Sequence, residues 1–191
     1  MGRVIFEVGM SLDGFIAGPN GRPGNPLGDG GTRIHQWVFN LASWRERLGL
    51  PGGEAGRDDE LVRASYARTG AYVMGRRMFD EGEVGWPENA PFRVPVFVVT
   101  HKPRPPWVRP GGTIFTFVTG GIGSALAQAR AAAGGHDVKI AGGADTIQQF
   151  LKAGLVDEFR VDLAPLLLGR GVRLFDQVDP DDLALEILEA I

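Results

Sequence analysis

The sequence predicts an α/β fold in which a parallel or mixed central sheet is covered by helices on both faces. Short strand-like runs alternate with helix-like segments along most of the chain. Glycine often follows these runs directly, where a strand passes into a helix, and the 191 residues include 29 glycines. A chain of this length is expected to form a single domain over residues 1–191.

Composition excludes several kinds of site. The chain has no cysteine, which excludes disulfide scaffolds, thiolate metal sites and cysteine nucleophiles. Its three histidines, His35, His101 and His136, are far apart in sequence, so we expect no metal site. A net charge of −3 with interspersed signs argues against nucleic acid or a membrane surface as partner. Without a long apolar stretch or a secretory signal, the chain is expected to be cytoplasmic.

The first elements follow from hydrophobic periodicity. Residues 4–10 alternate between two faces and predict a strand. Residues 11–21 are rich in turn formers, and residues 22–31 form a glycine-rich loop. Apolar side chains between Ile34 and Leu48 recur at nearly helical spacing, and this predicts one helix capped by Thr32.

The remaining elements alternate regularly. A loop over residues 50–56 precedes a helix that begins at Asp58 or Asp59 and ends at Gly70. The later predicted elements are strand 72–74, a helix starting over 75–79, strands 94–100 and 113–118, helix 122–133, strand 138–141, helix 144–152, a strand region 158–168 interrupted at Pro165, and a last strand 183–188.

Three glycine turns join a predicted strand to a predicted helix. They begin at Gly75, Gly120 and Gly142. Helix N-termini at such turns attract phosphates, and adjacent parallel strands present them along one edge of a sheet. None is a P-loop, and the TGGIGSA segment lacks the dinucleotide-binding spacing because Leu126 stands where the third glycine belongs. Close packing of a strand against a helix is the alternative explanation for Gly142 and Gly143.

Several short segments occur in an order typical of one known family. They are residues 10–17 (MSLDGFIA), 72–76 (YVMGR), 98–101 (VVTH), 140–144 (IAGGA), 154–158 (GLVDE) and 164–169 (APLLLG), with Leu174 and Phe175 behind them. Together they span about residues 3–176 and resemble the dihydrofolate reductase-like superfamily. More specifically, they resemble the reductase domain of the bifunctional riboflavin-biosynthesis deaminase–reductase (the RibD C-terminal domain family) and its stand-alone relatives.

This resemblance implies a three-layer αβα fold with a mixed, mostly parallel sheet, and an NADPH-dependent reductase. The implied activity is similar to that of 5-amino-6-(5-phosphoribosylamino)uracil reductase, with a small-molecule substrate of the pterin or ribosylaminouracil class. A dihydrofolate or pterin reductase and an NADP-binding paralogue without efficient turnover are the alternatives. A short-chain Rossmann oxidoreductase is disfavoured, because neither Tyr66 nor Tyr72 has a lysine four residues later.

The resemblance also implies a cofactor site. Its residues are Ile16, Ala17 and Asn20 in a mobile loop over the nicotinamide; Gly75, Arg76, Arg77 and Met78 at the pyrophosphate and 2′-phosphate; Thr100, His101 and Lys102 beside the adenosine; and Gly142, Gly143, Ala144, Asp145 and Thr146 at a helix N-terminus facing the pyrophosphate. The family has a cis peptide between the two glycines. A charge-assisted hydrogen bond to phosphate is worth about 1.5–3 kcal/mol, which suits the cations in this set. Solvated surface charge is the alternative for each of them.

Two acids are candidates for catalysis. Glu7 and Asp162 lie in otherwise apolar strands, where a carboxylate needs partners or a raised pKa, although an exposed strand face is the alternative. The predicted helix 34–48 shows no counterpart of the carboxylate with which dihydrofolate reductases bind the pterin. His35 and Trp37 are expected in the same substrate pocket, although Trp37 also suits a core position.

Two regions depart from the family pattern. Residues from about 22 to 57 are expected to be an insertion of loop and helix. The family fold closes with an antiparallel strand pair, whereas only one final strand is predicted here. Either the last strand is lost or another subunit supplies it, and we expect a homodimer because an open sheet edge would otherwise remain.

Overall fold

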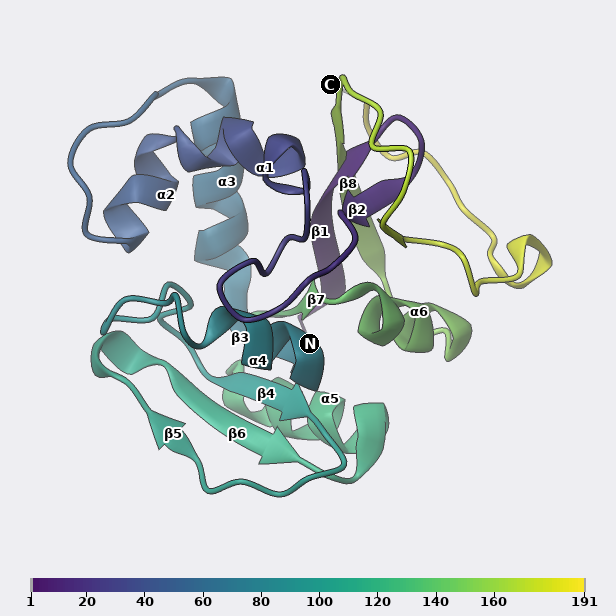
Figure 1. Cartoon of the computed structure of the whole chain (residues 1–191). Coiled ribbons are helices and arrows are strands. Elements are labelled where there is room, and N and C mark those ends of the chain that lie inside the picture. The colour runs from purple at the N-terminus through teal and green to yellow at the C-terminus, as the bar shows by residue number, and fades with distance from the viewer. Residues whose placement is uncertain (1, 191) are drawn as a thin grey trace.

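A mixed sheet forms the centre of the molecule in the computed structural model, which describes residues 2–190 (Figure 1). Within these residues its seven strands are β1 (Val4–Ser11), β3 (Thr69–Gly75), β4 (Val96–Val99), β5 (Trp107–Val108), β6 (Ile114–Val118), β7 (Asp137–Gly142) and β8 (Glu158–Ala164). Their order is β5-β6-β4-β3-β7-β1-β8, and only the β5–β6 pair is antiparallel. A small antiparallel sheet pairs β2 (Phe15–Ala17) with β9 (Val172–Arg173).

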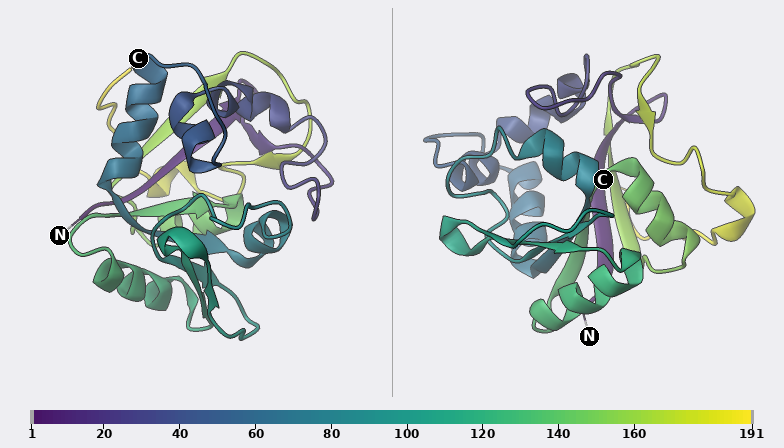
Figure 2. Two further views of the ribbon diagram at one scale, coloured as in Figure 1. Left: turned by 90° about the vertical axis from the view of Figure 1, so that its left-hand side faces the viewer. Right: turned by 60° about the horizontal axis from the view of Figure 1, so that its bottom comes forward.

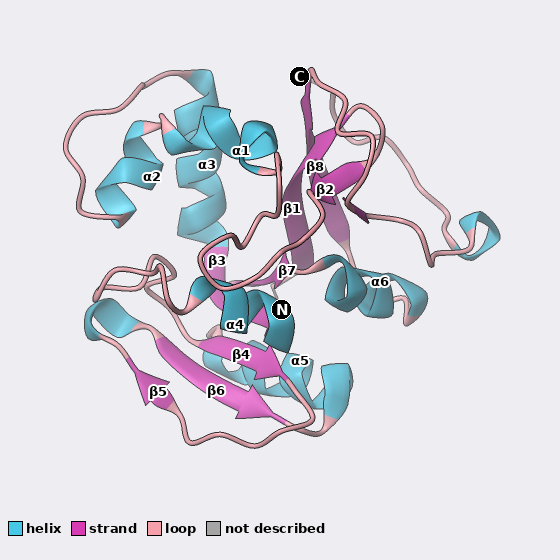
Figure 3. Ribbon diagram, in the orientation of Figure 1, coloured by secondary structure: helices cyan, strands magenta, loops and turns pink. Residues whose placement is uncertain are grey.

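Helices cover both faces of this sheet, as Figures 2 and 3 show. Those described are α1 (Thr32–Phe39), α2 (Ala42–Arg47), α3 (Arg57–Arg68), α4 (Arg76–Gly82), α5 (Gly121–Ala132) and α6 (Ala144–Lys152), with 3-10 turns η1 (Pro110–Gly112) and η2 (Pro180–Asp182). Helices α5 and α6 pack on one face, and α1, α3 and α4 lie on the other. The predicted α/β fold is therefore confirmed.

Two hydrophobic cores result, because alternate side chains of each strand point to opposite faces. On the α5 and α6 side, Phe6 is fully buried and stacks on Phe159 with ring centroids 4.7 Å apart. On the other side, the buried ring of Phe79 meets Phe115 edge-on at 5.2 Å and Trp86 at 5.7 Å. This second core fills only part of its face, and the rest of that face remains available for a site.

The single helix predicted between Ile34 and Leu48 is wrong. The chain instead forms α1 and α2, and Leu41 between them has extended backbone angles (φ −68°, ψ 144°). Leu41 is 4% exposed and bridges to Glu54 of the following loop. This tertiary contact interrupts a helix that periodicity alone would continue.

Other boundaries also differ from the predictions. Helix α3 ends at Arg68, and Gly70 already lies in β3. The strand predicted over residues 183–188 is wrong, because this segment pairs with no strand among the described residues and leaves Ile187 86% exposed. The short strands β2, β5 and β9 were not predicted, since two or three residues are too few to show a period.

None of the helices within residues 2–190 is both long and apolar enough to cross a membrane.

Candidate active site

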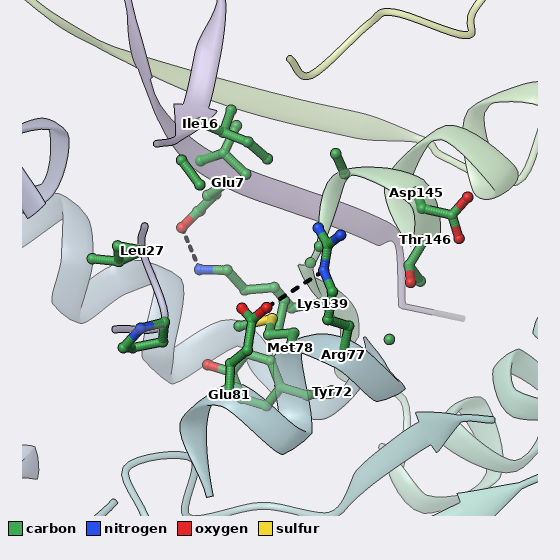
Figure 4. A pocket seen from close by; sticks show the side chains of 18 of the residues that line it. Glu7, Ile16, Leu27, Tyr72, Arg77, Met78, Glu81, Lys139, Asp145 and Thr146 are labelled. Atoms are coloured by element: carbon green, nitrogen blue, oxygen red, sulfur yellow. Dashed lines mark hydrogen bonds and ion pairs between the residues drawn. The ribbon is translucent and has the colours of Figure 1, made fainter. Parts of the chain in front are cut away.

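A cavity of about 910 Å³ opens on the face that carries α1, α3 and α4 (Figure 4). One part, which we call the glycine-rich half, lies at the carboxyl ends of β3, β4 and β7 and is lined by Gly75, Arg76, Arg77, Thr100, His101, Lys102 and residues 142–146. The other, the strand-floor half, has Glu7, Lys139, Arg160 and Asp162 of β1, β7 and β8 beneath side chains of α1, α2 and α3. Ligands commonly bind at such strand ends in α/β sheets.

The glycine-rich half depends on a close approach between β3 and α6. A Cβ atom on Gly75 would lie 2.4 Å from Oγ1 of Thr146, so only glycine fits there. Gly142 has a φ of +126°, which also favours glycine, and the peptide bond between Gly142 and Gly143 is cis, as the resemblance implies. Close packing was the alternative to ligand binding for Gly142 and Gly143, and the structure shows such packing at Gly75.

Helix α6 begins at the rim of this half. The first N–H groups of a helix have no acceptor within the helix, so those of Ala144, Asp145 and Thr146 can serve a bound anion. The Asp145 carboxylate accepts a hydrogen bond from Gln149 Nε2 at 2.7 Å, and Figure 4 shows it turned outward. The Asp145 carboxylate is therefore engaged by a side chain of its own helix.

Three cationic side chains line this half, and they differ in how closely an acidic group pairs with each. Arg76 Nε donates to Asp80 at 2.7 Å. Arg77 is 70% exposed and lies 3.6 Å from the carboxylate of Glu81. Lys102 makes no ion pair within residues 2–190, although its backbone N–H donates to Thr100 Oγ1 at 3.1 Å. Arg77 and Lys102 are thus the cations whose charge is least engaged by the protein.

Glu7 and Lys139 form the centre of the strand-floor half. Lys139 Nζ donates to Glu7 Oε2 and to Ser65 Oγ, the latter at 2.9 Å, and Ser65 Oγ donates to Glu7 Oε2 at 2.7 Å. Burial lowers the pKa of Lys139. Burial alone would raise the pKa of Glu7, but attraction by Lys139 and Arg160, together with these hydrogen bonds, outweighs it and lowers the pKa. Glu7 is therefore held as a carboxylate.

The pKa of Asp162 is shifted in the opposite direction to that of Glu7. Its Oδ1 lies 3.0 Å from Arg160 Nε in an ion pair. Burial nevertheless raises the pKa of Asp162, and the negative charge of Glu7 adds to the increase. Two carboxyl groups whose environments push their pKa values apart are typical of sites that handle protons. Of the two acids proposed from the sequence, Asp162 is the one suited to hold a proton.

Aromatic side chains wall the strand-floor half. They include Trp37, Trp44, Tyr66, Tyr72, Trp86 and Phe92. The guanidinium of Arg47 lies 3.7 Å from the ring centroid of Tyr66, and burial raises the pKa of Tyr66 to about 12. His35 Nε2 lies 3.4 Å from the carbonyl oxygen of Ile16, and burial lowers the pKa of His35. The wall is therefore uncharged near neutral pH.

The structure brings together nearly all residues proposed from the sequence. Ile16, Ala17, His35, Trp37 and Met78 line the cavity with the residues named above. Asn20 does not line it: the Asn20 side chain is exposed and donates to Asp29 Oδ2 at 2.7 Å, which fixes the loop itself. The placement of Asn20 over the nicotinamide stays a prediction.

Lys139 and Arg160 were not among the residues predicted for the site. Both occupy the polar position of an alternating strand, between Val138 and Ile140 and between Phe159 and Val161. A cation in an apolar strand is a signal that could have been used, because a buried lysine or arginine requires an anionic partner. The partner of Lys139 is 132 residues away, so the pairing itself was not visible.

A carboxylate also ties together two of the segments singled out in the sequence. Asp13 Oδ2 accepts from the N–H of Gly169 at 2.7 Å, and its Oδ1 accepts from Ser11 Oγ at 2.6 Å and from the N–H of Leu168 at 3.1 Å. These hydrogen bonds, the one from Ser11 foremost, lower the pKa of Asp13 to about 2. Asp13 thereby holds the turn before β2, and so Ile16 and Ala17, against residues 165–169.

Within residues 2–190, no group of three or more histidine, aspartate or glutamate side chains is placed to hold a metal ion.

Comparisons with known proteins converge on one family. The model of the RibD C-terminal domain matches residues 3–191. Among solved structures, a Shewanella sp. PV-4 protein named for riboflavin biosynthesis is 27% identical, with a TM-score of 0.58 over 90% of this chain and 82% of that one. A Thermotoga maritima diaminohydroxyphosphoribosylaminopyrimidine deaminase/5-amino-6-(5-phosphoribosylamino)uracil reductase is 12% identical, with a TM-score of 0.53 over 91% of this chain and 48% of that one, and it shares the fold.

Two curated relatives from Bacillus subtilis (strain 168) match over short stretches. The uncharacterized protein YyaP is 48% identical and the uncharacterized protein YwjB 39% identical, each over 44 residues. These stretches are 23% of this chain and 23% and 25% of the two relatives, so the match spans about a quarter of their length.

The burial of His35 predicts a pH dependence of stability. Because the pKa of His35 is lowered on folding, the unfolded chain binds its proton more readily below the ordinary pKa of 6.5. The free energy of unfolding should therefore fall as the pH is lowered below about 6.5, by up to about 1.4 kcal/mol per pH unit from this group.

Urea denaturation of the wild type and a His35→Gln variant between pH 7.5 and 5 measures this contribution. The free energy of unfolding of the His35→Gln variant should fall by less than that of the wild type between these two pH values. His136→Gln, at an exposed position, is the matched control and should behave as the wild type. Parallel curves for His35→Gln and the wild type would show that His35 does not contribute.

Proposed function

Because the chain belongs to the RibD C-terminal domain family, a family of NADPH-dependent reductases, we propose that it reduces a small molecule with NADPH. The substrate class we propose is that of the ribosylaminouracils, with pterins as the second candidate. The observation that carries the proposal is one cavity in which a glycine-rich strand edge, suited to an anion, adjoins a floor that carries Asp162, a half-buried acid whose pKa is raised by burial. An NADP-binding protein without turnover would need only the strand edge suited to an anion and not the acid on the floor.

The glycine-rich half fits NADPH. A Cβ atom on Gly143 or Gly121 would meet nothing within 4 Å, so the backbone there is open to a close ligand. The N–H groups at the start of α6 suit the pyrophosphate, and Arg77 and Lys102 suit the 2′-phosphate. Ile16 and Ala17 of β2 line the same cavity, and we place the nicotinamide against them. When bound, NADPH supplies the hydride.

The strand-floor half then supplies the proton. With a ribosylaminouracil, Asp162 in its protonated form would donate its proton to the ring oxygen of the ribose. That oxygen becomes a hydroxyl group as its bond to the anomeric carbon breaks and the hydride of NADPH adds to the same carbon. Glu7, kept ionised by Lys139, holds the cation beside it in place. The residues of α1 and α2, in the region of about 22–57 that we propose to be an insertion, add His35, Trp37 and Trp44 to the wall and exclude water.

Cofactor binding is the first test. Calorimetric titration should show clearly tighter binding of NADPH than of NADH. Replacing Arg77→Gln should weaken NADPH binding about ten-fold or more, the effect of losing one charge-assisted hydrogen bond, and should leave NADH binding almost unchanged.

Arg57→Gln, an exposed arginine at the start of α3 outside the cavity, is the matched control and should alter neither affinity. If the wild-type protein binds neither nucleotide, the proposed reductase function is wrong.

The proton donor is tested by Asp162→Asn. The amide cannot donate an acidic proton, so kcat should fall about 10²–10³-fold while NADPH binding is retained. Because the protonated form of Asp162 is the active one, wild-type kcat should decline as the pH rises through the raised pKa, and this decline should be absent from the variant.

Asp58→Asn on the exposed surface of α3 should keep the wild-type rate and pH profile. An Asp162→Asn enzyme with undiminished kcat would assign the proton to another group.

We further propose that two copies pair along β8. This strand is an edge of the sheet, and Leu163 on it is 60% exposed beside Leu12 and Leu167, which are 61% and 66% exposed. The extended, apolar segment 183–190 has no sheet partner among the described residues, so the chain offers both a free edge and an extended segment to cover it. The homodimer predicted from the sequence is proposed on this basis.

Light scattering measures the assembly directly. The wild type should have twice the mass of one chain, and Ile187→Asp should shift the mass toward that of a monomer. Leu50→Asp, an exposed leucine elsewhere, should leave it unchanged. A monomeric wild type would rule out the pairing.

A further inference from the structure

We propose that Arg160 of β8 binds the substrate, with the outer edge of its guanidinium, formed by Nη1 and Nη2, donating hydrogen bonds to a carbonyl oxygen of the substrate ring. The inference rests on the proposed reductase function and deepens it, because it names a residue that selects the substrate. The supporting observation is a guanidinium that is held on one side and open on the other.

Two carboxyl groups flank the held side of this guanidinium. Arg160 Nη2 donates to Glu7 Oε2 across 3.4 Å, and Arg160 Nε lies 3.0 Å from Asp162 Oδ1. The pairing of β1 with β8 places Glu7 directly opposite Arg160 in the sheet. The position of the guanidinium is therefore set by its Nε and Nη2 side.

The opposite side of the guanidinium has no partner in the protein. A guanidinium carries five N–H donors, and the one hydrogen bond that Arg160 makes within residues 2–190 is the long one to Glu7. Nε is buried and has no hydrogen-bond acceptor there. Nη1 also makes no hydrogen bond in this part of the chain, but it is not closed off, and the side chain lines the cavity and is 29% exposed. The Nη1 edge can therefore donate to a molecule in the cavity.

The other two arginines that line the cavity belong to its glycine-rich half. Arg76 Nε donates to Asp80 at 2.7 Å, and Arg77 Nε lies 3.6 Å from Glu81, all within α4. That half is the one we propose for NADPH. Arg160 is thus the arginine that the strand floor offers to the substrate.

Lys139 is the other cation of the strand floor, and most of its donors are used. Its Nζ donates to Glu7 Oε2 and to Ser65 Oγ, which occupies two of its three N–H groups. Lys139 therefore mainly holds Glu7 in place, whereas Arg160 retains several donors for a ligand.

The contact with Asp162 is compatible with the proton that the proposed function assigns to this residue. A protonated carboxyl group keeps one carbonyl oxygen that can face a cation, and Oδ1 is the oxygen beside Arg160. Oδ2 is then the oxygen that carries the proton. Arg160 thus has a neighbouring oxygen on Asp162 in either protonation state.

The open donors of Arg160 give the site a means of selection. A ligand that enters the cavity displaces the water that would otherwise satisfy these donors. A ring with a carbonyl oxygen at this point restores the hydrogen bonds, whereas a ring without one leaves charged donors unpaired. Sites of this kind discriminate against compounds that lack the partner group. Arg160 is therefore expected to determine substrate specificity and to leave NADPH binding unaffected.

The first test changes the substrate. The NADP⁺-saturated protein is titrated by calorimetry with 5-amino-6-ribosylaminouracil and with its 2-thio and 4-thio analogues. Sulfur is a weaker hydrogen-bond acceptor than oxygen, so one of the two thio analogues should bind about 10–100-fold more weakly, the effect of losing a hydrogen bond to a charged group. Equal binding of all three compounds overturns the inference.

The second test changes the protein. In Arg160→Gln the difference between the oxygen and sulfur compounds should disappear, and the KM of the oxygen compound should rise about 10–100-fold. The dissociation constant of NADPH should stay as in the wild type. General damage to the site would instead weaken the oxygen and sulfur compounds alike.

Two further variants complete this test. Arg160→Lys keeps the charge but lacks the planar fork, so it should also lose the discrimination, and it replaces Arg160→Gln if that variant does not fold. Arg33→Gln, an exposed arginine of α1 outside the cavity, is the matched control and should discriminate as the wild type does. Discrimination that survives in a folded Arg160 variant contradicts the assigned contact.

Failure of the proposed function gives a different result. If NADPH itself does not bind, the reductase function is wrong and the role of Arg160 falls with it. If NADPH binds but the ribosylaminouracils do not, the same comparison is made with a dihydropterin and its 4-thio analogue. Binding of NADPH without binding of either carbonyl compound overturns the inference about Arg160 and leaves cofactor binding intact.

Discussion

The ion pair between Glu7 and Lys139 is the interaction on which the site depends. It joins the central strands β1 and β7 on one face of the sheet, while Phe6 and Ile140 on the opposite face are fully buried in the core. Charges in such a position are stable only when they are paired and hydrogen-bonded, which requires Ser65 from α3 and Arg160 from β8. The pair thus links the sheet to the helical layer and keeps this part of the face polar. The rest of this face is covered by the aromatic core around Phe79.

A second constraint organises the other half of the cavity. The absence of a side chain at Gly75 lets β3 and α6 approach, and this approach sets the start of α6 beside Arg77. Asp13 adds a third connection by holding the turn before β2 against residues 165–169. Three separate structural features therefore converge on one cavity, and two of them, Gly75 and Asp13, lie in segments that resemble the same family. The division of the cavity into a glycine-rich half and a strand-floor half follows from them.

Family membership accounts for the fold, whereas the geometry of the site bears on the substrate. The match to the RibD C-terminal domain covers residues 3–191 and accounts for the sheet order and the glycine turns. It does not select the substrate, because the same fold hosts different reactions. The substrate depends on side chains that project from the strands and from α1 to α3, and those in this chain are aromatic or lie in ion pairs with one another.

The sequence by itself determined the elements with a clear local signal. Such signals are the alternation in β1, the alanine-rich sequence of α5 and the glycine turns before α4 and α6, each of which is recognisable from a few residues. An ordered set of short segments indicated the family. Tertiary contacts decided the rest. Leu41 is drawn into the core and divides a continuous helical pattern, and residues 183–188 alternate like a strand but pair with none in the described chain. Lys139 meets Glu7 only because β7 inserts between β3 and β1. Periodicity reports which face a residue occupies, whereas the partner across that face depends on strand order, and strand order is a property of the whole folded chain.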